Sequence, residues 1–177
     1  MFNIFLDLDG VLVTTRCTKT WIKHVLPYGK EHYSNLCFDE GAVFQFLRFL
    51  ECLQNHAEYR IILSSDWRWN NPEDSTRALF DKHGIPQYAD ITPVRDPETH
   101  GIRGKEILAW IKLNKAEEEP YLAIDDINCK PYVPNRNFVY VNGGWHSNGF
   151  NKWHFRHALV KAQLQLGIDP ATNKGFL

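Results

Sequence analysis

Residues 2–10 read FNIFLDLDG and contain the clearest indication of the fold class. Residues 4–6 form a short, fully apolar run that stops at Asp7, the pattern of a strand buried on both faces of a parallel sheet. Asp7 and Asp9 then emerge together at the carboxyl end of this strand, and Gly10 permits a turn closed to bulkier residues. Ligands bind beyond the carboxyl ends of strands in doubly wound sheets, so the two acids mark the expected site.

The rest of the chain alternates short apolar runs with amphipathic segments. Further strands are predicted at residues 61–63, 88–92, 121–124 and 138–141. Helices are predicted at residues 39–56, 72–83, 104–113 and 151–166, the first with Asp39 as its N-cap. Such alternation implies right-handed crossovers. The sequence therefore predicts an α/β fold with a doubly wound, mostly parallel, five-stranded sheet.

Length and composition are those of one globular domain over residues 1–177. Apolar residues make up 44% and charged residues 23%, and a net charge of -1 provides no global basic field for nucleic-acid binding. Within the domain, we predict a flap at residues 14–38 and a C-terminal loop and helix at residues 142–177. The residues between Gly10 and Ser64 leave no room for a full cap domain.

The sequence also predicts a cytoplasmic location without a membrane partner. The N-terminal apolar run is too short for a signal peptide or a membrane span. The four cysteines contain no CxxC pair, which argues against a zinc site or a redox dithiol. Nothing in the sequence indicates the oligomeric state.

The paired acids suggest phosphoryl chemistry. An ionised aspartate can attack phosphorus and split hydrolysis into formation and breakdown of an aspartyl phosphate, and Asp7 at the strand end suits this role. Asp9 could protonate the leaving oxygen and then activate water. The alternative is that both acids merely cap a turn.

Three further positions could complete the site. Ser64 and Ser65 end the second strand, where their hydroxyls could donate hydrogen bonds to phosphoryl oxygens. Lys105, near a helix start, could balance the charge of carboxylates and of a phosphoryl group. Asp125 and Asp126 follow a later strand and would bring a second acidic pair to the same crevice.

Four carboxylates at one sheet edge favour a bound divalent cation. Two like charges ~4 Å apart repel by about 4 kcal/mol at an effective dielectric of 20. Mg²⁺ accepts one or two carboxylates together with phosphate and waters. The predicted ligands are Asp7, Asp125 and the backbone carbonyl of Asp9, while Asp126 would orient a water or Lys105.

These positions resemble the four motifs of the haloacid dehalogenase-like (HAD-like) superfamily, in the family's order: Asp7-Leu8-Asp9-Gly10, Ser64, Lys105 and Asp125-Asp126. The stretch IILSSDWR at residues 61–68 and the segment 92–110 further resemble the HAD domain of Swiss Army Knife RNA repair proteins. The resemblance implies a magnesium-dependent phosphatase with an aspartyl-phosphate intermediate. It also implies phosphate contacts from Ser64, Lys105 and Gly10.

The chain departs from the family pattern after the motif serine. Many members have a glycine soon after it, whereas this chain continues Ser65-Asp66-Trp67-Arg68-Trp69. Either Ser64 or Ser65 could therefore contact phosphate. Trp67, Arg68 and Trp69 could form a rim that stacks bases of a large substrate, such as an RNA or DNA 3′-phosphate. The structural alternative is that Trp67 packs under the sheet and Arg68 pairs with Asp66 or Asp74.

Other functions stay open at this point. The flap at residues 14–38 could serve as a short lid over a small substrate, as a 5′-nucleotidase or other small-molecule phosphatase would need. An open crevice would also accept a phosphoprotein. A signalling receiver domain has a similar set of residues, but its acidic pair comes first, whereas Asp125-Asp126 comes last here. A non-catalytic phosphate-binding module would be expected to lack Asp7 or Asp9, and both are present.

Overall fold

The computed structural model describes residues 1–14, 16–17, 38–70, 73–93, 102–142 and 148–171. Within these ranges, five strands form one parallel sheet in the order β3-β2-β1-β4-β5. The strands are β1 (Phe2–Leu6), β2 (Tyr59–Leu63), β3 (Asp90–Ile91), β4 (Tyr121–Asp125) and β5 (Phe138–Tyr140). The predicted α/β fold is confirmed, and every strand pair of this sheet is parallel.

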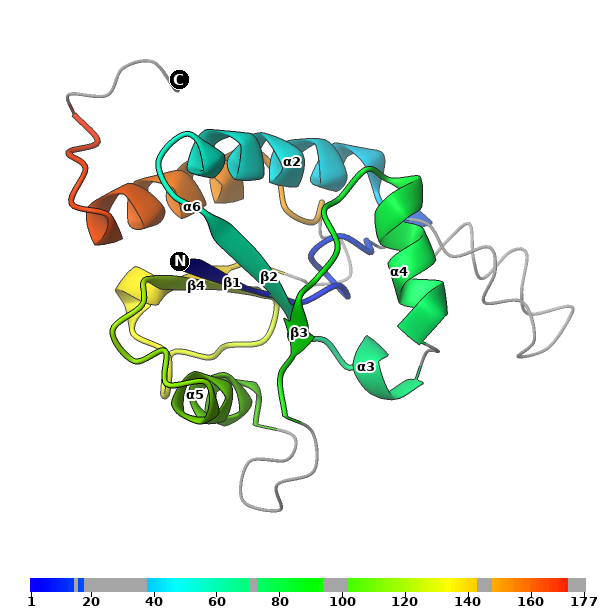
Figure 1. The fold of residues 1–177 in the computed structure, drawn as a ribbon. Helices are drawn as coiled ribbons and strands as arrows, with labels where there is room; N and C mark the ends of the chain where they lie inside the picture. Colours follow the sequence, from blue (N-terminus) through cyan, green and yellow to red (C-terminus); the bar gives the residue numbers. More distant parts are fainter. Residues whose placement is uncertain (15, 18–37, 71–72, 94–101, 143–147, 172–177) are drawn as a thin grey trace, which may run out of the picture.

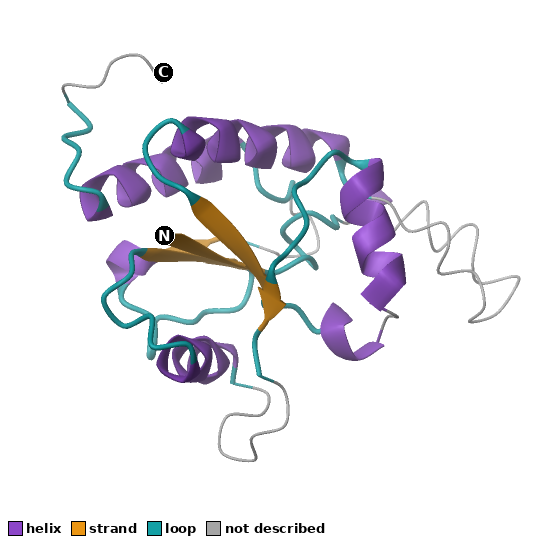
Figure 2. Cartoon of the chain, viewed as in Figure 1, coloured by secondary structure: helices purple, strands orange, loops and turns teal. Residues whose placement is uncertain are grey.

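Helices cover both faces of the sheet (Figure 2). They are α2 (Glu40–Gln54), α3 (Trp67–Asn70), α4 (Glu73–Lys82), α5 (Arg103–Leu113) and α6 (Lys152–Gln165), with a short 3-10 helix, η2 (Asn135–Asn137), before β5. Figure 1 shows α2 and α6 on one face and α5 on the other. The four predicted helices are present, whereas α3 was not predicted.

The two sheet faces bury different side chains, because successive residues of a strand point to opposite sides. Leu6, Leu63 and Ile124 belong to the core shared with α2 and α6. Their neighbours along the strands, Phe5, Ile62 and Ala123, pack with Ile107 and Trp110 of α5. By the same alternation, Asp7 and Asp125, which follow Leu6 and Ile124, point towards the α5 face.

Asp39 joins the loop after β1 to α2. Its carboxylate accepts a hydrogen bond from the Ala42 N–H at 3.0 Å, so Asp39 caps the helix as predicted. The Thr14 hydroxyl donates to the same carboxylate at 2.9 Å, and Arg16 pairs with it at 2.8 Å. These contacts fix the start of α2 beside the end of the loop that carries the predicted catalytic acids.

The predicted flap at residues 14–38 lies almost entirely outside the described residues, so its role as a lid stays a prediction. Among the residues that the structure describes, no helix combines the length and the apolar character that crossing a bilayer requires.

Candidate active site

The site lies where β1, β2 and β4 end side by side. The Asp7 N–H donates to the Ile124 carbonyl at 3.0 Å, and the Ser64 N–H donates to the Leu6 carbonyl at 2.8 Å. Asp7 and Asp125 are buried, at 3% and 2% exposed. The backbone ladder thus brings the N-terminal acids and the later acidic pair to one place, as the sequence predicted.

The loop after β1 is compact and depends on a glycine. The Leu8 carbonyl accepts hydrogen bonds from the N–H groups of Val11, Leu12 and Val13 at 3.2, 2.9 and 2.8 Å. Gly10 has a φ of +71°, which L side chains rarely adopt. A Cβ at Gly10 would also lie 2.6 Å from Cγ of Asp126. Gly10 therefore lets this loop and the Asp126 carboxylate approach each other closely.

Three carboxylates form a candidate metal centre. One oxygen from each of Asp7, Asp125 and Asp126 lies within 4.8 Å of the others. Oxygen donors of this kind suit Mg²⁺. The Asp9 side chain, in contrast, accepts a hydrogen bond from the Trp67 indole Nε1 at 3.0 Å. The structure therefore groups three of the four predicted acidic side chains and directs that of Asp9 to a different partner.

Burial raises the pKa of each of these carboxyl groups. The pKa of Asp7 lies well above its usual range, first because the group is buried and second because Asp125 is close, while Arg103 and a hydrogen bond from Ser65 act in the opposite sense. Burial raises the pKa of Asp125 to about 7, although Arg103 and the Ile127 N–H, at 2.7 Å, stabilise its charge. A cation bound among the acids would favour their ionised forms.

Asp9 and Asp126 show the same trend. Burial raises the pKa of Asp9, and the hydrogen bond from Trp67 partly offsets that increase. Burial also raises the pKa of Asp126, with a further contribution from the nearby charge of Asp9. The site as a whole therefore favours a positive partner, which is the electrostatic condition for a divalent-cation centre.

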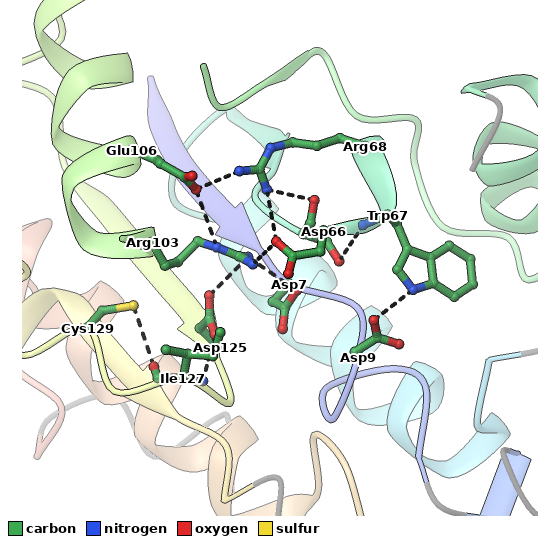
Figure 3. Close-up of polar contacts among 11 residues, drawn as sticks. Asp7, Asp9, Asp66, Trp67, Arg68, Arg103, Glu106, Asp125, Ile127 and Cys129 are labelled. Carbon is green, nitrogen blue, oxygen red and sulfur yellow. Dashed lines mark hydrogen bonds and ion pairs between the residues drawn. The ribbon is translucent and has the colours of Figure 1, made fainter. Parts of the chain in front are cut away.

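Arg103 contacts the nucleophile candidate Asp7, and it was not among the residues predicted from the sequence. Its Nη1 lies 3.2 Å from an Asp7 oxygen and 3.3 Å from an Asp125 oxygen. Its Nη2 lies 3.0 Å from Asp66, and its Nε lies 3.6 Å from Glu106 (Figure 3). Each nitrogen of the guanidinium thus faces a carboxylate, which fixes the orientation of the whole group.

The predicted cation Lys105 lies elsewhere on the same helix. Its ammonium nitrogen is 5.8 Å from the centroid of the Tyr132 ring. The preceding residue, Gly104, is also close to Tyr132, because a Cβ there would lie 2.7 Å from Tyr132 Cβ. A catalytic role for Lys105 stays a prediction, while the contacts with Asp7 and Asp125 belong to Arg103.

Arg68 lies behind Arg103, not at a substrate rim. Its side chain is 1% exposed, and its Nη2 lies 2.5 Å from Glu106, which is 3% exposed. Its Nη1 donates to the Ser65 carbonyl at 2.6 Å and lies 3.9 Å from Asp66. The prediction that Arg68 stacks bases is therefore wrong. The alternative prediction, that Arg68 pairs with Asp66, is met by the longer of its two ion pairs, and the shorter one is with Glu106.

Trp67 also departs from the predicted rim. It is 6% exposed, and its ring lies 6.2 Å from that of Phe38 in the apolar core. A buried indole that donates to Asp9 leaves no face for a base, so this part of the prediction is wrong as well. The side chain of Trp69 lies outside what the structure describes.

The two candidate serines differ in their partners. Ser65 hydrogen-bonds to Asp7, and its hydroxyl accepts from the Trp67 N–H at 3.4 Å. Ser64 is 1% exposed, and its hydroxyl has no hydrogen-bond partner within the described part of the chain. A buried hydroxyl with an unmet hydrogen bond is costly unless a ligand completes it.

A parallel sheet of this strand order, with acids from β1 and β4 at the carboxyl ends of the strands, is consistent with the HAD-like class of α/β domains. The family model of the HAD domain in Swiss Army Knife RNA repair proteins matches residues 3–172, and the chain belongs to that family. Comparison with the curated proteins and with the solved structures gave no significant match. Membership of this family implies a hydrolase of the phosphatase type.

Proposed function

We propose that this chain is a magnesium-dependent phosphomonoester hydrolase that works through an aspartyl phosphate on Asp7 and acts on a phosphorylated RNA or DNA end. One observation carries the proposal. Asp7 is buried among Asp125, Asp126 and Arg103, while the Asp9 side chain lies outside the group of three carboxylates and accepts a hydrogen bond from Trp67. Two acids of one motif thus have environments suited to two different tasks.

Mg²⁺ fits the residues present. Asp7, Asp125 and Asp126 offer the oxygen donors that it prefers, and burial raises the pKa of all three in the absence of a cation. When bound, the ion would neutralise negative charge on the acids and on phosphoryl oxygens. The backbone carbonyl of Asp9 stays a proposed further ligand.

In the first step, an Asp7 oxygen forms a bond to phosphorus as the bond from phosphorus to the leaving oxygen breaks. Asp9 gives its proton to that leaving oxygen, which departs as a neutral alcohol. In the second step, Asp9 takes a proton from water, and the water oxygen attacks phosphorus. The bond to Asp7 then breaks, which releases phosphate and restores both acids.

Two groups would hold the phosphoryl oxygens during these steps. The Ser64 hydroxyl is buried with an unmet hydrogen bond at the strand end beside Asp7, and a phosphoryl oxygen would satisfy it. Arg103 already contacts the carboxylate that would carry the phosphoryl group, and its charge would stabilise the transferred oxygens. Ser65 instead supports Asp7 through its hydrogen bond.

The proposal of a nucleic-acid substrate rests on the family description, which names RNA repair proteins. The buried positions of Trp67 and Arg68 give it no support from base stacking. A 5′-nucleotidase or other small-molecule phosphatase is therefore the competing outcome of the test.

The test compares hydrolysis of a 3′-phosphorylated oligonucleotide, a 5′-mononucleotide and a phosphopeptide, with Mg²⁺ and with EDTA, in the wild type and in Asp7→Asn. We expect Mg²⁺-dependent turnover that is fastest on the oligonucleotide and absent in the variant. Faster turnover of the mononucleotide would show that the substrate is a small molecule and not a nucleic-acid end. Failure of the folded, Mg²⁺-loaded wild type on all three would refute the phosphatase proposal.

A further inference from the structure

The segment that follows β2, residues 65 to 68, makes polar contacts towards the site with four successive residues. Three of these contacts reach Asp7, Asp9 or Arg103, and the fourth reaches Glu106, which itself pairs with Arg103. Figure 3 shows the contacts of Asp66, Trp67 and Arg68. The pairs are Ser65 with Asp7, Asp66 with Arg103 at 3.0 Å, Trp67 with Asp9 at 3.0 Å and Arg68 with Glu106 at 2.5 Å. The segment thus supports the residues of the site, whereas the sequence suggested that part of it would contact the substrate.

Trp67 is the member of this segment that contacts Asp9. Its indole is 6% exposed, packs near Phe38 and donates to Oδ2 of Asp9. Its backbone N–H lies within 3.4 Å of the Ser65 hydroxyl. The ring is therefore fixed both by its packing and by the backbone of the segment, so it provides a rigid support for the Asp9 carboxylate.

The chemistry of the indole suits this support. An indole N–H only donates, so it neither takes a proton from Asp9 nor gives one up in the reaction. Because Oδ2 of Asp9 is engaged by Trp67, Oδ1 is the oxygen left to pass the proton to the leaving group and later to take one from water. A carboxylate without this contact would rotate among several orientations, few of which place an oxygen correctly.

We infer that Trp67 is a positioning residue for Asp9: its indole N–H holds one carboxylate oxygen so that the other meets the leaving oxygen. This inference rests on the proposed function. It assigns proton transfer as the step that Trp67 supports, and it distinguishes this role from a general contribution to the core.

The molecule contains a matched control. Trp110 of α5 is also buried, at 2% exposed, and its indole Nε1 donates to an oxygen of Asp90 at 2.7 Å. Its ring packs edge-on against Phe5, with centroids 5.3 Å apart. Trp67→Phe and Trp110→Phe thus remove the same kind of indole–carboxylate hydrogen bond, and only the first involves Asp9.

The experiment measures kcat/KM for the best alkyl phosphomonoester of the panel above and for p-nitrophenyl phosphate. The aryl leaving group departs with little help from an acid, whereas the alkyl group needs a proton. We expect Trp67→Phe to lower kcat/KM by ~10- to 100-fold on the alkyl ester and by only about threefold on the aryl ester. Trp110→Phe should change both values by less than about threefold.

A second measurement places Trp67→Phe in an Asp9→Asn background. Since Trp67 acts through Asp9, the added change should cause no further loss of kcat/KM on p-nitrophenyl phosphate. Equal losses on both esters, a further loss in this background, or wild-type kinetics in Trp67→Phe would each overturn the inference while the phosphatase proposal stands. If the wild type hydrolyses neither ester, the phosphatase proposal itself fails, and this inference fails with it.

Discussion

The two sides of the site are held by different forces. On one side, Asp7 follows β1 and Asp125 ends the neighbouring parallel strand β4, so backbone hydrogen bonds fix their separation. On the other side, the guanidinium layer, which consists of Arg68, Arg103 and Glu106, depends on buried ion pairs between long side chains. The strand side should therefore tolerate changes in its charges without unfolding, whereas the guanidinium layer should not.

The largest effect should come from substitutions on the strand side, which should lower kcat without unfolding the protein. Asp7→Asn removes the nucleophile while it preserves shape, so we expect kcat to fall by ~10⁴-fold or more. Asp9→Asn should approach this loss on alkyl esters. Thermal unfolding should show both variants folded. Full activity in either variant would refute the role assigned to that residue.

The guanidinium layer should show its effect in stability. Arg68→Met and Glu106→Gln each leave a buried charge without its main partner, so each should lower the free energy of unfolding by ~3–5 kcal/mol. The double variant removes both charges and should recover most of that loss. Denaturant unfolding of the three variants measures this coupling.

An exposed ion pair provides the control for that cycle. Arg77 and Glu73 pair at 2.7 Å on α4, with side chains 35% and 67% exposed. Removal of either partner should change the free energy of unfolding by less than ~1 kcal/mol. Equal effects at the two pairs would contradict the distinction between the two sides of the site.

Arg103 belongs to the guanidinium layer but also contacts Asp7, so a replacement that keeps its charge should affect kcat more than stability. Arg103→Lys keeps the charge but loses the fork that faces Asp7, Asp66 and Asp125, so we expect kcat to fall by ~10²- to 10³-fold. Lys105→Met should lower kcat by less than about tenfold, within the range of an indirect effect. A larger loss of kcat in Lys105→Met would support the role predicted from the sequence, in which Lys105 balances the charge of the phosphoryl group.

The smallest effect is a dependence of stability on pH. Without a divalent cation, the raised pKa values of Asp7 and Asp125 mean that the folded protein binds more protons than the unfolded chain between about pH 4 and pH 7. Their contribution to stability is present below this window and is lost as the pH rises through it. We expect Tm in EDTA to fall across the window, less steeply in Asp125→Asn, and Mg²⁺ to reverse the fall.

An unchanged slope in Asp125→Asn would show that this carboxyl group is not the origin of the pH dependence. A Tm that does not respond to Mg²⁺ near pH 8 would argue against a cation site among these acids.

The acids were predictable from the sequence because strand patterns determine where strands end. An apolar run followed by Asp7, and another followed by Asp125, suffice to place both carboxylates at the same sheet edge. The helices were found for a similar reason, since Asp39 caps α2 as the sequence indicated and α6 lies within the predicted range 151–166. Local rules thus account for the fold and for the strand side of the site.

Closeness to the start of α5 was not enough to tell which cationic residue contacts Asp7. Arg103 and Lys105 both lie near the start of α5, and only the lysine was predicted to belong to the site. The apolar stripe of the helix offered a better guide, because Arg103 precedes Ile107 and Trp110 at four- and seven-residue spacing on the buried face. Lys105 does not follow this spacing.

The sequence left two positions open for Trp67, a substrate rim or a place in the core, and the structure shows the second. The sequence shows that it follows β2, but it does not show whether the chain turns outward or folds back over the site. The short helix α3, which begins at Trp67, brings the indole to Asp9. Such a contact between distant segments depends on tertiary packing, which local patterns do not encode.

Phosphorylation of Asp7 can be detected in a variant that forms the aspartyl phosphate but hydrolyses it slowly. The Asp9→Asn variant, mixed with p-nitrophenyl phosphate and Mg²⁺ and quenched in acid, is analysed by intact and peptide mass spectrometry. We predict the added mass of one phosphoryl group in the N-terminal peptide, at Asp7, because the aryl ester reacts without an acid and the missing base slows hydrolysis of the intermediate. Release of p-nitrophenol with no phosphoprotein, or with the phosphoryl group on another residue, would contradict the account.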